Sequence, residues 1–143
     1  MACRRWEQVR PTLLAHLTKA KDYALLTEIY LLEKEIDAAL ESVEKVKYAW
    51  YAWGHETLSI QVAKAAEQDR PEAALRIYQT TVDKLIAARG RDNYKTATHY
   101  LKRMRPLHQR LDQTKAWQTL IARIREKNGA LRALKEELDK AGL

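Results

Sequence analysis

The chain has 143 residues, of which 46% are apolar and 31% are charged, with only four Gly and three Pro. This balance is typical of a single soluble, all-helical domain with a hydrophobic core, and it argues against a disordered chain. The one cysteine excludes an intramolecular disulfide and a thiolate metal cluster, and no apolar run approaches the ~18 residues of a membrane span. Because no apolar leader follows the basic first residues, we expect a cytoplasmic protein.

The net charge of +7 comes entirely from the second half of the chain. Residues 1–70 contain 10 Lys and Arg against 11 Asp and Glu, whereas residues 71–143 contain 16 against 8. Such asymmetry points to an acidic partner, for example nucleic acid, an anionic membrane surface or an acidic protein surface.

The first part of the chain predicts three helices in close succession. Residues 5–19 carry apolar side chains at helical spacing, with Pro11 marking either an early turn or a late helix start. Asp22 is placed as the N-cap of a helix over residues 22–33, and residues 35–46 repeat the periodicity after almost no linker. Two helices joined so closely predict an antiparallel hairpin.

The middle of the chain contains an aromatic segment and two further helices. Residues 47–56 either extend the preceding helix or form an aromatic connection to the next one. The helical pattern resumes over residues 56–66, and Pro71 is well placed as the first residue of another helix. That helix is expected to end at Gly90, which can adopt a left-handed conformation at a helix C-terminus.

The last part of the chain predicts three helices. Asp92 or Asn93 is expected to cap a long helix, which Pro106 should kink. Its expected buried stripe consists of Tyr94, Ala97, Leu101, Met104, Leu107 or His108, and Leu111. A hairpin partner over residues 117–124 and a final helix over residues 131–138 follow. The whole chain thus predicts about eight helices in antiparallel hairpins and no strand.

Internal similarity indicates a helical repeat. Ala39 and Ala74 each end an Ala-Ala pair on an expected buried face, and they lie 35 residues apart, close to the ~34-residue period of tetratricopeptide repeats. Tyr30 precedes Ala39 by nine positions, which resembles the aromatic-then-small pattern of that repeat, although Thr27 stands where a glycine is usual. We therefore expect a tetratricopeptide-like α-solenoid, a right-handed α-α superhelix, forming one domain over residues 1–143.

A second resemblance covers most of the chain. It rests on the stretches EIYLLEKEIDAAL, VAKAAEQDRPEAALRIYQ, LIAARGRDNYKTATHYLKRMR and ALRALKEELDKAGL. These are similar to the C-terminal helical region of bacterial SWIM zinc-finger proteins. The resemblance implies an uncharacterised helical module, either stand-alone or part of a longer protein with an upstream partner domain. Zinc binding is not implied, because the CxC pair of the zinc motif is absent here.

No pattern in the sequence predicts catalysis or a metal site. No two histidines have the i, i+4 spacing of a helical metal site, and the HETLS segment at His55 lacks the second His of an HExxH motif. We expect His16 and His108 to be partly buried and His99 to be solvated. Glycine-rich phosphate loops and the GxSxG motif are also absent, so we expect neither an enzyme nor a cofactor.

The basic stretch after residue 88 has two interpretations. Its cations lie at the start of the long helix and opposite the apolar stripe: Arg89, Arg91, Lys95, Lys102, Arg103 and Arg110. They form either a strip that neutralises phosphates in a salt-dependent way or an ordinary solvated helix face. The second interpretation is favoured, because Tyr94 and Tyr100, which could stack on bases, fall on or beside the packed face.

The aromatic segment also has two interpretations. Its large side chains are Tyr48, Trp50, Tyr51 and Trp53. They either fill the space between two hairpins or anchor a protein partner, as large aromatic residues do at many interfaces. Packing is the favoured role, with at least one ring touching a partner.

Together these patterns predict a non-enzymatic helical-repeat module for protein interaction or scaffolding. The alternative is an accessory nucleic-acid-binding domain that uses the basic strip of residues 89–110. The expected partner is another protein or an upstream domain, self-association is compatible with either function, and no membrane role is expected.

Overall fold

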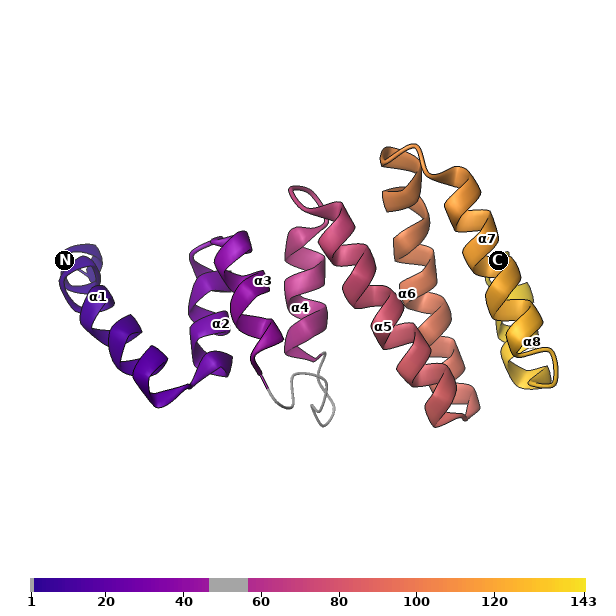
Figure 1. The fold of residues 1–143 in the computed structure, drawn as a ribbon, viewed down its shortest axis with the longest axis horizontal. Helices are drawn as coiled ribbons and strands as arrows, with labels where there is room; N and C mark the ends of the chain where they lie inside the picture. The colour runs from indigo at the N-terminus through magenta and orange to yellow at the C-terminus, as the bar shows by residue number, and fades with distance from the viewer. Residues whose placement is uncertain (1, 47–56) are drawn as a thin grey trace. The chain divides into compact units, whose positions relative to one another are not determined.

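The structure is a computed structural model that describes residues 2–46 and 57–143, and in these residues it contains only helices and no strands (Figure 1). The all-α prediction is therefore confirmed for this part of the chain. The eight described helices are α1 (Ala2–Ala20), α2 (Tyr23–Leu32), α3 (Ile36–Glu44), α4 (Leu58–Ala66), α5 (Pro71–Ala88), α6 (Arg91–Arg110), α7 (Thr114–Lys127) and α8 (Arg132–Lys140). Among them, none has the length and apolar character needed to cross a lipid bilayer.

The aromatic segment lies outside the described residues. This applies to all four of its large side chains, Tyr48, Trp50, Tyr51 and Trp53. The chain divides into two compact units, Met1–Asp69 and Arg70–Leu143. That all 143 residues form one domain stays a prediction.

In the first unit, α1 packs against α2. Leu17 on α1 is buried together with Leu26 and Ile29 on α2. Near the middle of α1, the Arg10 guanidinium forms an ion pair with Glu33, with 2.8 Å between Nε and Oε2. Pro11 lies inside α1, which already begins at Ala2, so the alternatives of an early turn or a late start were wrong.

The α2–α3 hairpin is held by small side chains and a buried hydrogen bond. Asp22 caps α2 as predicted, accepting a hydrogen bond from the Leu25 amide at 3.2 Å. Ala39 on α3 is fully buried, and the hydroxyls of Thr27 and Ser42 lie 2.7 Å apart. The fourth helix, α4, packs against both α2 and α3, so the hairpin is covered by a third helix.

In the second unit, the most extensive contact joins α5 and α6. Pro71 occupies the first turn of α5, as predicted. Tyr78 of α5 is fully buried, and its ring stacks against Tyr100 of α6 with 5.8 Å between the ring centroids. The expected apolar stripe of α6 is buried from Tyr94 to His108. Both α7 and α8 also pack on α6, so this helix is central to the unit.

One backbone motif ends four of the described helices. After α1, α2, α6 and α8, a residue with positive φ closes the helix: Lys21, Lys34, Asp112 and Gly142. In each case its amide and the following amide donate back to carbonyls of the last turn, for example Lys21 N–H to Thr18 O at 3.1 Å and Asp22 N–H to Leu17 O at 2.9 Å. This is the Schellman arrangement, which satisfies the last carbonyls of a helix.

The connection between α5 and α6 is built differently. Arg89 has φ 62° and ψ 163°, and Gly90 follows with φ 105°. Gly90 occupies the N-cap position of α6, while Asp92 and Asn93 lie in its first turn, so the prediction that either of them caps the helix was wrong. The Asn93 side chain instead donates a hydrogen bond of 2.7 Å to the Arg89 carbonyl, which closes the turn.

Candidate functional site

Arg91, expected at the mouth of the basic strip, is engaged with α8. Its guanidinium contacts Glu136 at 2.8 Å and Glu137 at 3.0 Å. These hydrogen bonds raise the pKa of Arg91 and lower the pKa of Glu136. Because the Glu137 side chain is only 7% exposed, the pair joins the start of α6 to α8 beside the packed interface. Arg91 thus serves the internal packing of this unit.

The other cations of the strip divide into two groups. Arg103 is half-buried, and its Nε donates a hydrogen bond of 3.2 Å to the Tyr78 hydroxyl, which links α6 to α5. Lys95 and Lys102 lie on the exposed side of α6, with no ion pair to any described residue. Arg89 and Arg110 are exposed at the two ends of the stretch. The structure therefore does not present the six predicted cations as one uniform surface.

A further basic residue of α6 was not singled out from the sequence. Arg105 is half-buried, donates a hydrogen bond of 2.9 Å to the Gly142 carbonyl, and lies over the Trp117 ring at 5.8 Å. It thereby ties α6 to α7 and to the segment after α8. Its sequence position, one residue before Pro106, gave no signal of these distant partners.

The described histidines differ in burial. His108 is 9% exposed and lies 5.6 Å from the Trp117 ring. Burial has the largest effect on its pKa and lowers it, while the Gln113 side chain acts in the opposite direction. Neither ring nitrogen meets hydrogen-bond geometry with a described residue. His16 is exposed, so the expectation that it is partly buried was wrong, and His99 is exposed as expected. Among the described residues, no group of three potential ligands could hold a metal ion.

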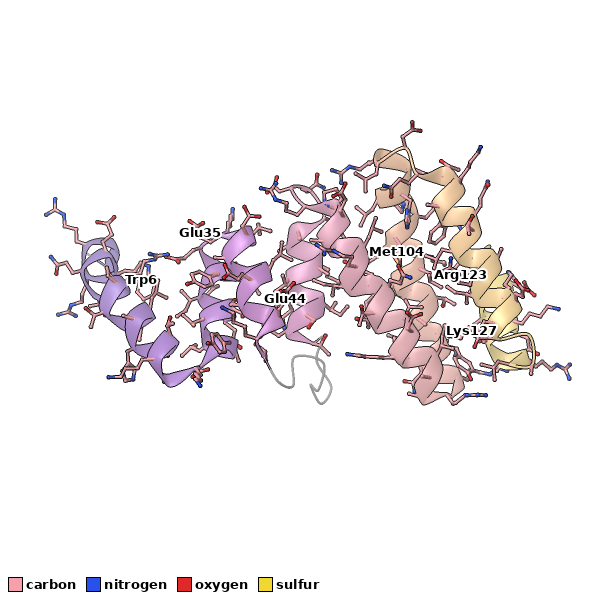
Figure 2. All side chains as sticks on the ribbon, viewed as in Figure 1. Trp6, Glu35, Glu44, Met104, Arg123 and Lys127 are labelled. Carbon is pink, nitrogen blue, oxygen red and sulfur yellow. The ribbon has the colours of Figure 1, made fainter. Side chains whose placement is uncertain are left out.

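A groove of about 440 Å³ is lined by α5 and α7. Its apolar surface comes from Ile86, Ala87, Leu120 and Ile124, and its charged residues are Asp83, Arg89, Arg123 and Lys127. Arg123 and Lys127 are four residues apart on α7, so they lie on the same side of that helix (Figure 2). We call this the α5–α7 groove. Sequence reasoning found Arg89 but missed both α7 cations, whose four-residue spacing beside Leu120 and Ile124 was the available signal.

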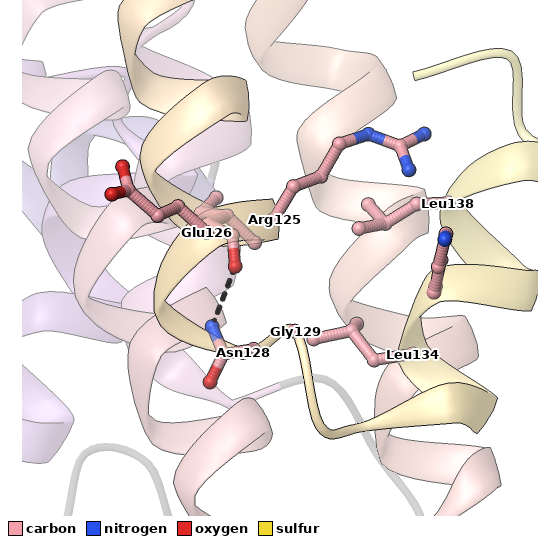
Figure 3. Close-up of a pocket in the computed structure, with 8 residues that line it drawn as sticks. Arg125, Glu126, Asn128, Gly129, Leu134 and Leu138 are labelled. Carbon is pink, nitrogen blue, oxygen red and sulfur yellow. Dashed lines mark hydrogen bonds between the residues drawn. The ribbon is translucent and has the colours of Figure 1, made fainter.

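Two other hollows in this unit differ from the α5–α7 groove, because an arginine that lines both of them is paired within the chain. One of about 360 Å³ lies between α7 and α8 and is lined by Ile124, Leu134 and Leu138 (Figure 3). Arg125 at its edge is paired with Asp139 at 2.8 Å. The other, about 510 Å³, lies beside Trp117 and also includes Arg125. In both hollows, this arginine is already neutralised by an acidic residue of the chain.

Comparison with known proteins gives one relative of unknown function. The chain is 31% identical over 107 residues to a Bacillus subtilis protein described as "Uncharacterized protein YwqB". The matched region is 70% of this chain but only 20% of that protein, so the chain spans about a fifth of the length of the curated relative it matches. No family model matches the chain, and no solved structure matches it either.

Proposed function

We propose that the chain is a non-enzymatic helical-repeat module that binds another protein. The observation that carries this proposal is the repeated packing of helices within each unit. In the first unit, α4 contacts both members of the α2–α3 hairpin, and in the second unit α6 contacts both α7 and α8. Contacts between a helix and its second neighbour along the chain are expected where helix pairs stack as repeats.

The spacing of the helices along the sequence supports the same proposal. The helices α2, α4 and α6 begin at Tyr23, Leu58 and Arg91, which are 35 and 33 residues apart. Tetratricopeptide repeats recur at ~34 residues, so a tetratricopeptide-like right-handed superhelix is the arrangement that we propose. The buried Ala39 and Ala74 fit this proposal, since small side chains let paired helices approach closely.

Repeat arrays usually hold a segment of another protein on their extended surface. We propose that the aromatic segment, residues 48–53, supplies anchors for this contact, because Trp and Tyr dominate the binding energy of many interfaces. The same surface could hold an upstream domain of a longer chain or a second copy of this one. A cytoplasmic location belongs to the same proposal.

The test is capture of binding proteins with the tagged chain and its variants. A partner retained by the wild type should be lost with Trp50→Ala or Trp53→Ala and kept with Lys95→Ala/Lys102→Ala, a matched change at two exposed α6 positions. Far-UV circular dichroism must show that each variant is folded. Equal retention by all variants, or no retained partner at all, contradicts the proposal.

A second candidate function is nucleic-acid binding through the exposed cations of the basic strip. The observation that favours it is that Arg89, Lys95 and Lys102 are exposed and form no ion pair with a described residue. Titration into fluorescent single- and double-stranded oligonucleotides tests it at low and near-physiological salt. Binding that persists at the higher salt and is lost in Lys95→Gln/Lys102→Gln would place this function first. Arg103 is left unchanged, because it holds Tyr78.

A further inference from the structure

We infer that the α5–α7 groove binds an acidic, amphipathic peptide segment of a partner protein. This inference rests on the proposed function and names one surface and one partner chemistry for it. The groove volume of about 440 Å³ falls in the ~300–1,000 Å³ range of pockets that hold drug-sized ligands, so the groove has room for a few side chains of such a segment. Both helices that line it belong to the second unit, so its geometry depends on the packing of that unit alone.

The charges of the groove are not balanced within the chain. Arg89, Arg123 and Lys127 line it together with one acidic residue, Asp83. None of these three cations forms an ion pair with a described residue. Most of the other arginines near α8 form ion pairs within the chain. Arg91 pairs with Glu136 and Glu137, Arg125 with Asp139, and Arg132 with Glu136. Where the chain neutralises neighbouring cations and leaves these three exposed, their natural complement is a carboxylate from outside.

The apolar part of the groove sets the second requirement on the partner. Leu120 is half-buried, and Ile86 and Ile124 are buried but still line the groove. A groove lined by buried apolar residues together with exposed cations matches a segment that has apolar side chains on one face and carboxylates on the other. This is the helix-in-groove mode of peptide recognition.

Nucleic acid fits the same groove less well. No aromatic side chain lines it, so bases have no ring on which to stack. Phosphates would satisfy the cations but would leave Leu120 and its apolar neighbours without a matching surface. The combination of charge and apolar area therefore favours a peptide.

The backbone at Arg89 adds support. Its φ of 62° and ψ of 163° fall in a region that strongly favours glycine, and Gly90 directly follows it. A glycine at position 89 would be less strained, yet the chain carries an arginine whose side chain reaches the groove. Arg89→Gly therefore removes the cation while relaxing the backbone, which separates a loss of binding from a loss of stability.

The probe is a fluorescein-labelled peptide of Glu, Leu and Ala, about 12 residues long, with Leu at every third or fourth position. Two control peptides have the same composition in scrambled order and the same order with Gln in place of Glu. Binding is measured by fluorescence anisotropy. We expect the amphipathic acidic peptide to bind the wild type at least about tenfold more tightly than either control peptide.

Three variants locate the binding on the protein. Arg89→Gly and Arg123→Glu/Lys127→Glu should each weaken binding about tenfold or more, with Arg89→Gly melting no lower than the wild type. The matched control, Lys95→Glu/Lys102→Glu, makes the same two charge reversals on α6 and should leave the affinity unchanged.

Three results would overturn the inference. They are equal binding of the scrambled peptide, equal weakening by the α6 control, and a single-stranded oligonucleotide that binds the wild type more tightly than the peptide through Arg123 and Lys127. A partner whose capture depends on Trp50 but not on Arg123 and Lys127 would leave the proposed function standing while refuting this groove as its site.

Discussion

The buried hydrogen bond between α2 and α3 allows a quantitative test of the first unit. Thr27 is fully buried and Ser42 is 6% exposed, and their hydroxyl oxygens lie 2.7 Å apart. The Thr27 hydroxyl also lies 2.7 Å from the Tyr23 carbonyl, which can only accept. Each hydroxyl has one proton, and the Thr27 hydroxyl lies closer to the Tyr23 carbonyl, at 2.7 Å, than the Ser42 hydroxyl does to the Ala39 carbonyl, at 3.2 Å. We therefore assign the Thr27 proton to Tyr23 and the Ser42 proton to Thr27.

Two substitutions and their combination isolate this bond. Thr27→Val keeps the shape of the side chain and removes the acceptor, while the Ser42 proton can turn to the Ala39 carbonyl at 3.2 Å. No buried donor is then stranded, so the loss should be about 1 kcal/mol in the free energy of unfolding. Ser42→Ala should cost about the same. In the double variant the bond is lost only once, so the coupling energy should be about 0.5–1 kcal/mol.

The measurement is urea unfolding followed by far-UV circular dichroism for the wild type, both single variants and the double variant. Thr80→Val is the matched control, because Thr80 is exposed and its hydroxyl bonds only the Arg76 carbonyl of its own helix. Its effect should stay within about 0.5 kcal/mol. Strictly additive single effects would show that the Thr27–Ser42 bond does not contribute to stability and would refute the reasoning.

Two pH-dependent effects follow from the pKa shifts. The hydrogen bond from Arg10 lowers the pKa of Glu33, so its stabilisation is present above the ordinary carboxyl pKa of about 4.3 and is lost as the pH falls through the lowered value. Glu33→Gln should therefore be less stable than the wild type at pH 7, with a difference that shrinks in acid; a constant difference in thermal melts contradicts this. Burial lowers the pKa of His108, so the wild type should lose stability as the pH falls below about 6.5. His108→Leu removes two ring nitrogens without hydrogen-bond partners and should abolish this loss of stability in acid. If the melting temperature of the variant keeps the pH dependence of the wild type, another group titrates and the prediction is wrong.

The buried side of the helices was largely predictable from the sequence. The stripe from Tyr94 to Met104 follows helical periodicity without interruption, and each of its predicted members is buried. Helix ends were harder to predict. Gly90, Asp92 and Asn93 are all residue types that occur at the N-cap of a helix. In the structure Gly90 takes this position, and the Asn93 side chain, inside the first turn, bonds the Arg89 carbonyl.

The candidate site was less predictable, because it depends on partners far away in the sequence. Arg91 is neutralised by two glutamates 45 and 46 residues later, which a local view of the basic strip cannot reveal. Arg103 is similarly held by Tyr78, 25 residues earlier. The α5–α7 groove joins two helices that are not consecutive, so its three cations came together only in the folded unit.

The Schellman turns bear on how far the sequence of this chain could diverge without loss of the fold. Each of the four turns ends a helix with two backbone hydrogen bonds. The residue with positive φ differs from turn to turn: it is Lys21, Lys34, Asp112 or Gly142. Backbone geometry, more than any side chain, specifies the path. Homologous chains could therefore replace most turn residues and keep only the apolar spacing of the helices. Exchanging Lys21, Lys34 or Asp112 for glycine should be accepted readily, so these turns are natural places to add stability without altering a binding surface.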